Sequence, residues 1–92
     1  MGSKKFTVEL KKAESIKEMV AAVKSAASAN DIDFKGDEKK GSGGRAGAKI
    51  SYVVTGTRVD ISVEDSWRSR LANWDAARLE KEVRKWIGPY IK

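Results

Sequence analysis

The chain has 92 residues, contains no cysteine and no histidine, and carries a formal net charge of +6 at pH 7. This length suits one small domain, and 40% hydrophobic residues with three tryptophans is an ordinary globular composition. The two missing residue types exclude disulfides, thiolate nucleophiles, histidine metal sites and the Ser-His-Asp triad, and with them most familiar hydrolytic chemistry.

The first part of the chain has the pattern of a strand followed by a helix. Residues 1–3 are expected to be disordered or left over from cloning, and residues 4–10 alternate between apolar and polar side chains, as in a half-buried strand. Apolar residues then recur at helical spacing over residues 16–29. Ser15 followed by Glu18 is a capping-box signal, so we expect this helix to begin with Ser15 as its N-cap.

The middle of the chain predicts a short strand, a long loop and a hairpin. Residues 31–35 alternate again. Residues 36–47 include five glycines and no large apolar side chain, so they have little to bury that would offset their ordering entropy, and we expect a flexible Gly-rich loop. Residues 48–64 form two alternating runs around Gly56, which predicts a hairpin with one apolar face and one face in water.

The last part of the chain predicts a helical turn and a second long helix. We expect the turn and a loop within residues 65–73, then a helix that Asp75 caps and that Gly88 and Pro89 end. The order is therefore β-α-β-β-β-α in a single domain spanning residues 1–92. The expected fold class is α+β, with two helices packed on one face of a four-stranded, mostly antiparallel sheet. A right-handed crossover would make its first two strands a parallel element.

The positive charge favours an anionic partner such as nucleic acid. The glycines at 41–47 suggest a phosphate-binding loop, but such a loop opens a helix and carries a Lys-Ser/Thr pair, whereas this segment precedes a strand and lacks the pair. We expect this segment to be a solvated linker, or else a flexible basic loop that contacts an anionic macromolecule or another protein together with the exposed sheet face, and not a specific phosphate site. The candidate anion-binding or nucleic-acid-binding residues are Lys39, Lys40, Arg45, Lys49, Arg68 and Arg70.

The large apolar residues of the last third offer a second kind of site. The candidate interaction patch, which would support a weak homodimer, is made of Trp67, Leu71, Trp74 and Tyr90. The tryptophans could instead stack on the bases of a single strand, but in so small a domain we favour core positions for most of them. Trp67 is the one that we expect to be exposed. The sequence predicts no catalytic residue, no cofactor and no metal site.

Two family resemblances bear on function. From the first helix to the last, the order α-β-β-β-α is similar to double-stranded RNA-binding domains, which place a hairpin loop and the start of the second helix on RNA. Where that family has a lysine cluster, this chain has Asp75, Ala76 and Ala77.

Over nearly its whole length, the chain more closely resembles the small bacterial polyhydroxyalkanoic acid system proteins. This likeness rests on Phe34-Lys35-Gly36, on Gly47 leading into residues 50–54, on the strand Val59-Ile61-Val63, and on the closing helix through Leu79, Val83 and Ile87. The insert at residues 37–45 departs from the family. The resemblance implies a non-enzymatic accessory protein associated with storage granules.

These observations together predict a non-catalytic binding or accessory module that contacts an anionic macromolecule or a protein partner. The alternatives are an RNA-binding domain of the α-β-β-β-α type and a homo-oligomerising structural protein. The longest apolar run, Met19 to Val23, is far shorter than the roughly 20 residues that span a bilayer, so we expect a cytoplasmic protein without a transmembrane segment, either a monomer or a weak homodimer.

Overall fold

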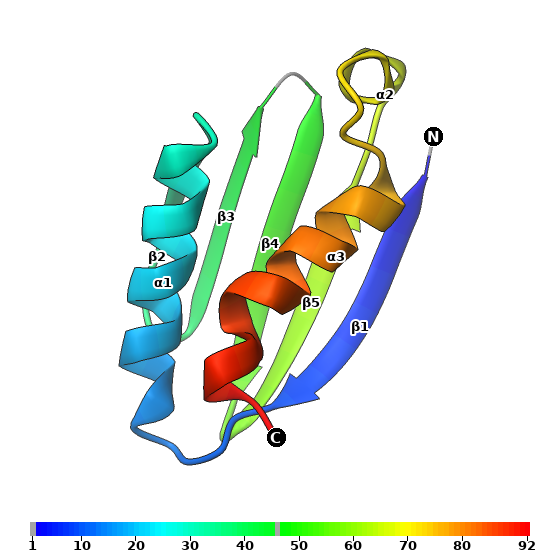
Figure 1. Ribbon diagram of the computed structural model, residues 1–92. Coiled ribbons are helices and arrows are strands. Elements are labelled where there is room, and N and C mark those ends of the chain that lie inside the picture. The colour runs from blue at the N-terminus through cyan, green and yellow to red at the C-terminus, as the bar shows by residue number, and fades with distance from the viewer. Residues whose placement is uncertain (1, 46) are drawn as a thin grey trace.

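The hairpin expected at residues 48–64 forms the centre of a five-stranded sheet in the computed structural model, which describes residues 2–45 and 47–92. Every neighbouring pair of strands is antiparallel, and the order across the sheet is β1-β5-β4-β3-β2 (Figure 1). The strands are β1 (Ser3–Glu9), β2 (Asp33–Gly36), β3 (Lys40–Arg45), β4 (Ala48–Thr55) and β5 (Arg58–Glu64). The α+β class is confirmed, with five strands where four were expected.

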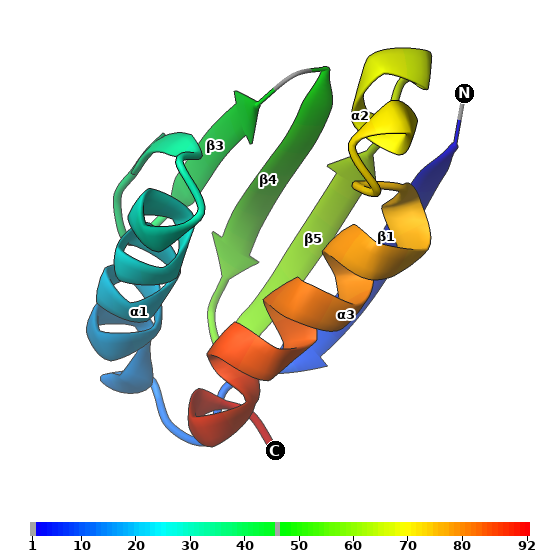
Figure 2. The same cartoon turned by 45° about the horizontal axis from the view of Figure 1, so that its top comes forward.

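Two long helices cover the same face of the sheet and leave the other face open (Figures 1 and 2). They are α1 (Ser15–Ala29) and α3 (Ala76–Ile87). The five-residue helix α2 (Trp67–Leu71) lies at the end of the sheet where β5 stops, as the expected helical turn (Figure 2). A 3-10 turn (Gly88–Tyr90) follows α3.

The core lies between the sheet and the two long helices, because each element presents one apolar face there. The alternation in β4 and β5 and the apolar stripes of the helices place these side chains as expected. The buried hydrophobic residues are Val8, Leu10, Met19, Val20, Val23, Ala27, Ile32, Ala48, Ile50, Tyr52, Val59, Ile61, Val63, Ala76, Leu79, Val83 and Ile87.

The expected parallel pairing of the first two strands is wrong. β1 pairs with β5 along its whole length, from Ser3 opposite Glu64 to Glu9 opposite Arg58. Strand β2 has only four residues and pairs with β3 at the far edge of the sheet. The loop between β1 and α1 therefore takes the chain to the other edge of the sheet, where α1 runs alongside β2 (Figure 1).

The expected Gly-rich loop at 36–47 is largely a strand, and the aromatic rings of neighbouring strands explain why. Gly41 lies opposite Tyr52 and Gly43 opposite Phe34, and the two rings stack with centroids 5.8 Å apart. A Cβ atom on Gly41 would overlap the Tyr52 ring, with Cζ only 2.7 Å away. The rings thus supply the apolar surface that β3 lacks, a known way of stabilising glycine in a sheet. Ala46 lies outside the described residues.

The helix caps follow the sequence signals only in part. Asp75 caps α3 as expected, since its Oδ1 accepts a hydrogen bond of 2.8 Å from the Arg78 backbone N–H. Ser15 is not the N-cap of α1: it is a buried residue inside the first turn, and Glu14 precedes it without a side-chain cap. Gly88 keeps a right-handed φ of −47° and begins the 3-10 turn.

The start of the chain is held by a buried carboxylate and is more ordered than expected. Asp65, just after β5, accepts hydrogen bonds from the Gly2 N–H at 2.7 Å and from the Ala76 N–H at 2.8 Å. The Arg70 Nε lies 3.5 Å from its Oδ1. Asp65 therefore joins the N-terminal residues, the end of the sheet and the start of α3. Of residues 1–3, only Met1 lies outside the described residues.

This arrangement predicts acid-sensitive stability. The N–H donors of Gly2 and Ala76, followed by the Arg70 charge, hold the pKa of Asp65 below its ordinary value of 3.8. The Asp65 carboxylate therefore binds a proton more readily in the unfolded chain than in the folded one. Its contribution to the free energy of unfolding is present above a pH of about 4 and is lost as the pH falls through the folded-state pKa. We expect Asp65→Asn to lower the urea midpoint at pH 7 and to reduce the loss of stability between pH 6 and pH 3.

Unfolding followed by tryptophan fluorescence measures both effects. Part of the acid slope should remain, because the pKa values of Asp37 and Glu80 are also lowered, mainly by hydrogen bonds from the Lys40 backbone and from Arg84, respectively. Asp33→Asn, which removes an exposed carboxylate of β2, is the control. Equal midpoints for the two variants at pH 7 would contradict the role given to Asp65.

A second prediction concerns β3. Gly41→Ala places a methyl group against the Tyr52 ring, so we expect a loss of about 1 to 3 kcal/mol in the free energy of unfolding, the usual cost of overpacking. Gly88→Ala is the matched control, because a Cβ there meets nothing within 4 Å and its φ is helical. We expect this control to be neutral or slightly stabilising. If both variants unfold at the same urea concentration, the close packing of β3 under Tyr52 is not what orders it.

Candidate functional site

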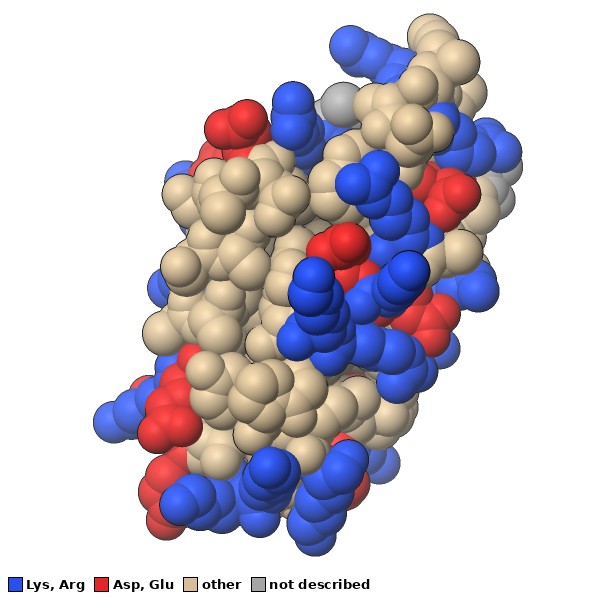
Figure 3. Space-filling model, viewed as in Figure 1, with Lys and Arg blue, Asp and Glu red and all other residues tan. Residues whose placement is uncertain are grey.

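Helix α3 exposes a line of positive side chains along its outer face. Leu79, Val83 and Ile87 are buried against the sheet, which turns the remaining positions outward. Figure 3 shows Lys and Arg side chains running down this helix, with Asp and Glu side chains among them. The exposed cations of α3, here called the α3 ridge, are Arg78, Lys81, Arg84 and Lys85.

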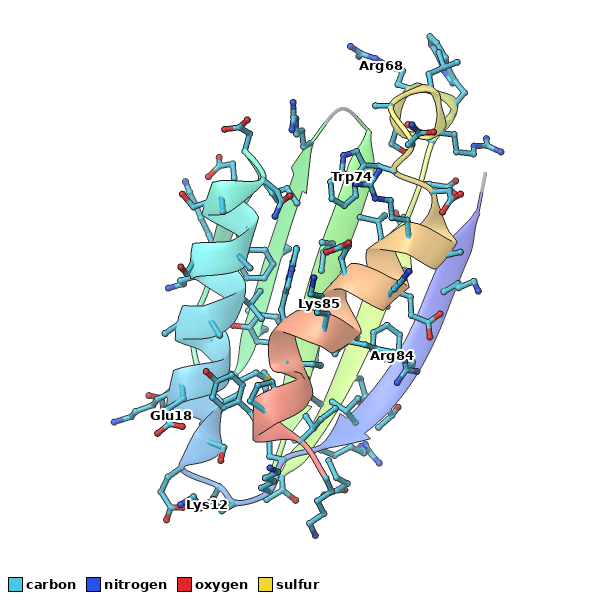
Figure 4. All side chains as sticks on the ribbon, viewed as in Figure 1. Lys12, Glu18, Arg68, Trp74, Arg84 and Lys85 are labelled. Carbon is cyan, nitrogen blue, oxygen red and sulfur yellow. The ribbon has the colours of Figure 1, made fainter. Side chains whose placement is uncertain are left out.

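Neighbouring aromatic rings hold the two arginines of the ridge. The guanidinium carbon of Arg78 lies 4.3 Å from the centroid of the Trp74 ring, and its Nη1 donates to the Asn73 carbonyl at 3.1 Å. The guanidinium carbon of Arg84 lies 4.3 Å from the centroid of Phe6. Such contacts fix the direction of a guanidinium while leaving its charge in place. Arg84 and Lys85 project from α3 in Figure 4.

The ridge differs along its length in how much charge is already paired. Arg84 donates to Glu80 Oε2 at 2.8 Å, and Lys4 lies 3.6 Å from the other carboxylate oxygen of Glu80. The hydrogen bond from Arg84, followed by the charges of Arg84 and Lys4, lowers the pKa of Glu80 and keeps it ionised. Lys81 and Lys85 form no ion pair with any residue described in the structure. These two lysines are free to bind an external anion.

Four of the six predicted anion-binding residues gather at the α2 end of the sheet. The hairpin between β3 and β4 brings the backbone of Arg45 and Lys49 to this end, since a Cβ on Gly47 would lie 3.7 Å from the Cβ of Arg68. The Arg45 side chain turns toward the end of α1, where its Nη1 donates to the Asn30 carbonyl at 3.0 Å and lies 3.9 Å from Asp31. Arg68 projects from α2 at the top of Figure 4, and Arg70 lies on the same turn.

The other two predicted residues, Lys39 and Lys40, lie at the turn between β2 and β3. This is the opposite end of β3, about 20 Å away for a strand of six residues. Asp37 holds the turn by accepting from the backbone N–H groups of Lys39 at 2.7 Å and Lys40 at 3.0 Å. The structure therefore does not bring the six residues into one site.

The predicted apolar patch is also divided. Trp67 and Leu71 of α2 are 65% and 78% exposed, as expected for Trp67. Trp74 is half-buried beneath Arg78. Tyr90 lies beyond the other end of α3, where its carbonyl accepts from the Lys11 N–H at 3.0 Å. Only the two α2 residues form an exposed apolar pair.

The open face of the sheet carries charges of both signs. Arg58 and Asp60 form an ion pair of 3.7 Å, and Thr7 donates to the same Asp60 at 2.9 Å. Lys49 lies opposite Glu64 on neighbouring strands. The charge of this face is therefore close to balanced. The structure supports contact of a polyanion with the open sheet face less than it supports contact with the helix side.

Two shallow hollows flank the turn between β2 and β3, on the α1 side and on the open sheet face. The one phenol that lines them, Tyr52, has its pKa raised by burial and donates its hydroxyl to the Asp37 carbonyl. Within residues 2–45 and 47–92, no three acidic side chains are close enough to hold a metal ion. No helix in the same ranges is both long and apolar enough to cross a membrane.

Comparison with known protein families, curated proteins and solved structures gives no match for this chain. The resemblance to polyhydroxyalkanoic acid system proteins stays a prediction. The order of elements along the chain differs from the predicted α-β-β-β-α order, because four strands, β2 to β5, lie between the two long helices.

Sequence reasoning missed Lys81, Arg84 and Lys85 as candidate site residues. The signal was present, because cations spaced three and four apart on the side of a helix opposite its apolar stripe must share an exposed face. The sequence analysis instead placed a candidate binding loop at the glycines of residues 41–47, although these glycines have a structural role.

Proposed function

We propose that this protein is a non-catalytic nucleic-acid-binding module whose α3 ridge holds the phosphate backbone. The observation that carries the proposal is the exposed row of Arg78, Lys81 and Lys85 on one helix face. At 1.5 Å of rise per residue these cations are spaced by about 4.5 and 6 Å along the axis, and their long side chains can reach successive phosphates.

The carboxylates of α3 do not cancel this charge. Asp75 lies at the start of the helix and accepts from the Arg78 backbone N–H while keeping its charge, and Glu80 is paired with Arg84 and Lys4. Glu82 is half-buried, whereas Lys81 and Lys85 are exposed. An approaching polyanion therefore meets Lys81 and Lys85 as exposed cations that no described carboxylate pairs.

The chemistry of the ridge favours the backbone over the bases. Ammonium and guanidinium groups contact phosphate oxygens, and such contacts supply affinity and orientation without reading sequence. A protein partner would instead need a buried anchor residue at the centre of its contact, and the exposed face of α3 presents no large apolar side chain. The proposal is therefore sequence-independent binding that weakens with salt.

The variant Lys81→Glu/Lys85→Glu tests this proposal. We expect it to weaken binding to a fluorescein-labelled 20-nucleotide RNA at least tenfold at 50 mM salt. The log-log salt slope, which should be about −3 for the unmodified protein, should become shallower by one to two, because each lost phosphate contact releases about one fewer counterion. Fluorescence anisotropy gives both values, and circular dichroism checks the fold.

Lys39→Glu/Lys40→Glu is the matched control, because it changes net charge equally at the far end of β3. We expect less than a threefold loss for this pair. A larger loss for the control than for the α3 variant would move the site to the turn between β2 and β3. Absence of binding to RNA and to DNA at 20 mM salt would refute the proposal.

A further inference from the structure

We propose that Trp67 on α2 is a stacking platform for an unpaired base, so that the protein favours single-stranded over duplex nucleic acid. This inference rests on the proposed function and names its substrate class. It follows from the exposure of Trp67 on a capped turn, from the cation of Arg68 beside it and from the position of α2 next to the start of α3.

The exposure of Trp67 is built into the fold and does not result from a loose segment. Ser66 and Ser69 form a reciprocal capping box around α2, with the Ser66 N–H donating to the Ser69 hydroxyl at 2.9 Å. Ser69 is fully buried, and its carbonyl accepts from the Trp74 N–H at 2.7 Å. Trp67 is nevertheless 65% exposed. A well-anchored turn thus holds a large aromatic surface out in water.

Cations lie on the same turn as this aromatic side chain and at the same end of the sheet. Arg68 forms no ion pair with any residue described in the structure, whereas Arg70 lies 3.5 Å from Asp65. Lys49 belongs to the start of β4 at this end, and the side chain of Arg45 turns toward the end of α1, 3.9 Å from Asp31. Asp65, the carboxylate nearest in sequence, is buried under its own hydrogen bonds. An aromatic ring among cations suits a base with its phosphates, since the ring stacks while the cations neutralise the backbone.

The position of α2 continues the line of the ridge. The chain passes from α2 into α3 within four residues, and Arg78 packs over Trp74 in that connection. Figure 4 shows Arg68 at the α2 end of the molecule and Lys85 farther along α3. A nucleic-acid strand whose phosphates lie on the α3 ridge therefore leads to α2, which carries Trp67.

The geometry favours an unpaired base over the other apolar partners. In a duplex both faces of an internal base are covered by its neighbours, so a protruding indole stacks only on a base that is free. Stable bilayer binding needs more buried apolar surface than two side chains on one turn provide. Leu71 adds apolar contact beside the ring but cannot stack.

The test compares Trp67→Ala, Trp67→Phe and Leu71→Ala on fluorescein-labelled dT12 and on a 12-base-pair DNA duplex. We expect Trp67→Ala to weaken dT12 binding about tenfold and duplex binding less than twofold, because stacking on one base is lost. Trp67→Phe should recover most of the affinity. Leu71→Ala, the matched control on the same turn, should cost less than threefold. Tryptophan emission should be quenched by dT12 in the unmodified protein and much less in Trp67→Phe.

The outcomes separate this inference from the proposed function. One outcome is that Trp67→Ala weakens binding to dT12 and to the duplex equally, or leaves binding to both unchanged, while Lys81→Glu/Lys85→Glu abolishes binding to both. In either case the stacking role is wrong and the proposed phosphate-backbone site is retained. If no nucleic acid binds, both fail. If Trp67→Ala and Leu71→Ala both reduce binding to vesicles of anionic phosphatidylglycerol and leave dT12 binding unchanged, the exposed pair contacts lipid and the inference is overturned.

Discussion

The buried carboxylate of Asp65 is the interaction on which the rest of this structure depends. It receives the N–H groups of Gly2 and Ala76, which are separated by most of the chain, and lies beside Arg70. A carboxylate placed in the interior is tolerated only when such donors surround it. By fixing where β5 ends and where α3 begins, it also fixes the direction in which α2 protrudes.

A second constraint is that the two long helices cover only one of the two faces of the sheet. The helices bury one face, and on that side the rings of Tyr52 and Phe34 cover the glycines of β3. The exposed edge of β1 is partly closed by the C-terminal residues, because the Lys92 N–H donates to the Glu9 carbonyl at 2.9 Å. This contact covers only the end of β1, and no described strand pairs with the rest of its outer edge.

Helix α3 combines the structural and the proposed functional roles. Its buried stripe sets its rotation on the sheet, and the same 3.6-residue period then directs the ridge cations outward. Trp74 and Phe6 hold the two arginines without neutralising them. The positive surface is thus a consequence of how the core is packed, and α2 adds an exposed aromatic side chain at one end of it.

The sequence by itself determined the α+β class, the hairpin at 48–64, the Asp75 cap and the exposure of Trp67, because alternation, helical spacing and capping are local signals. It also contained the α3 ridge, as cations opposite an apolar stripe. Only the tertiary structure decided that β3 is a strand, that β1 pairs with β5, and that the hairpin carrying Arg45 and Lys49 lies beside α2 while Lys39 and Lys40 lie at the far end of β3. Each of these depends on contacts between residues far apart in the chain, and local patterns carry no information about which distant partner will supply the missing surface.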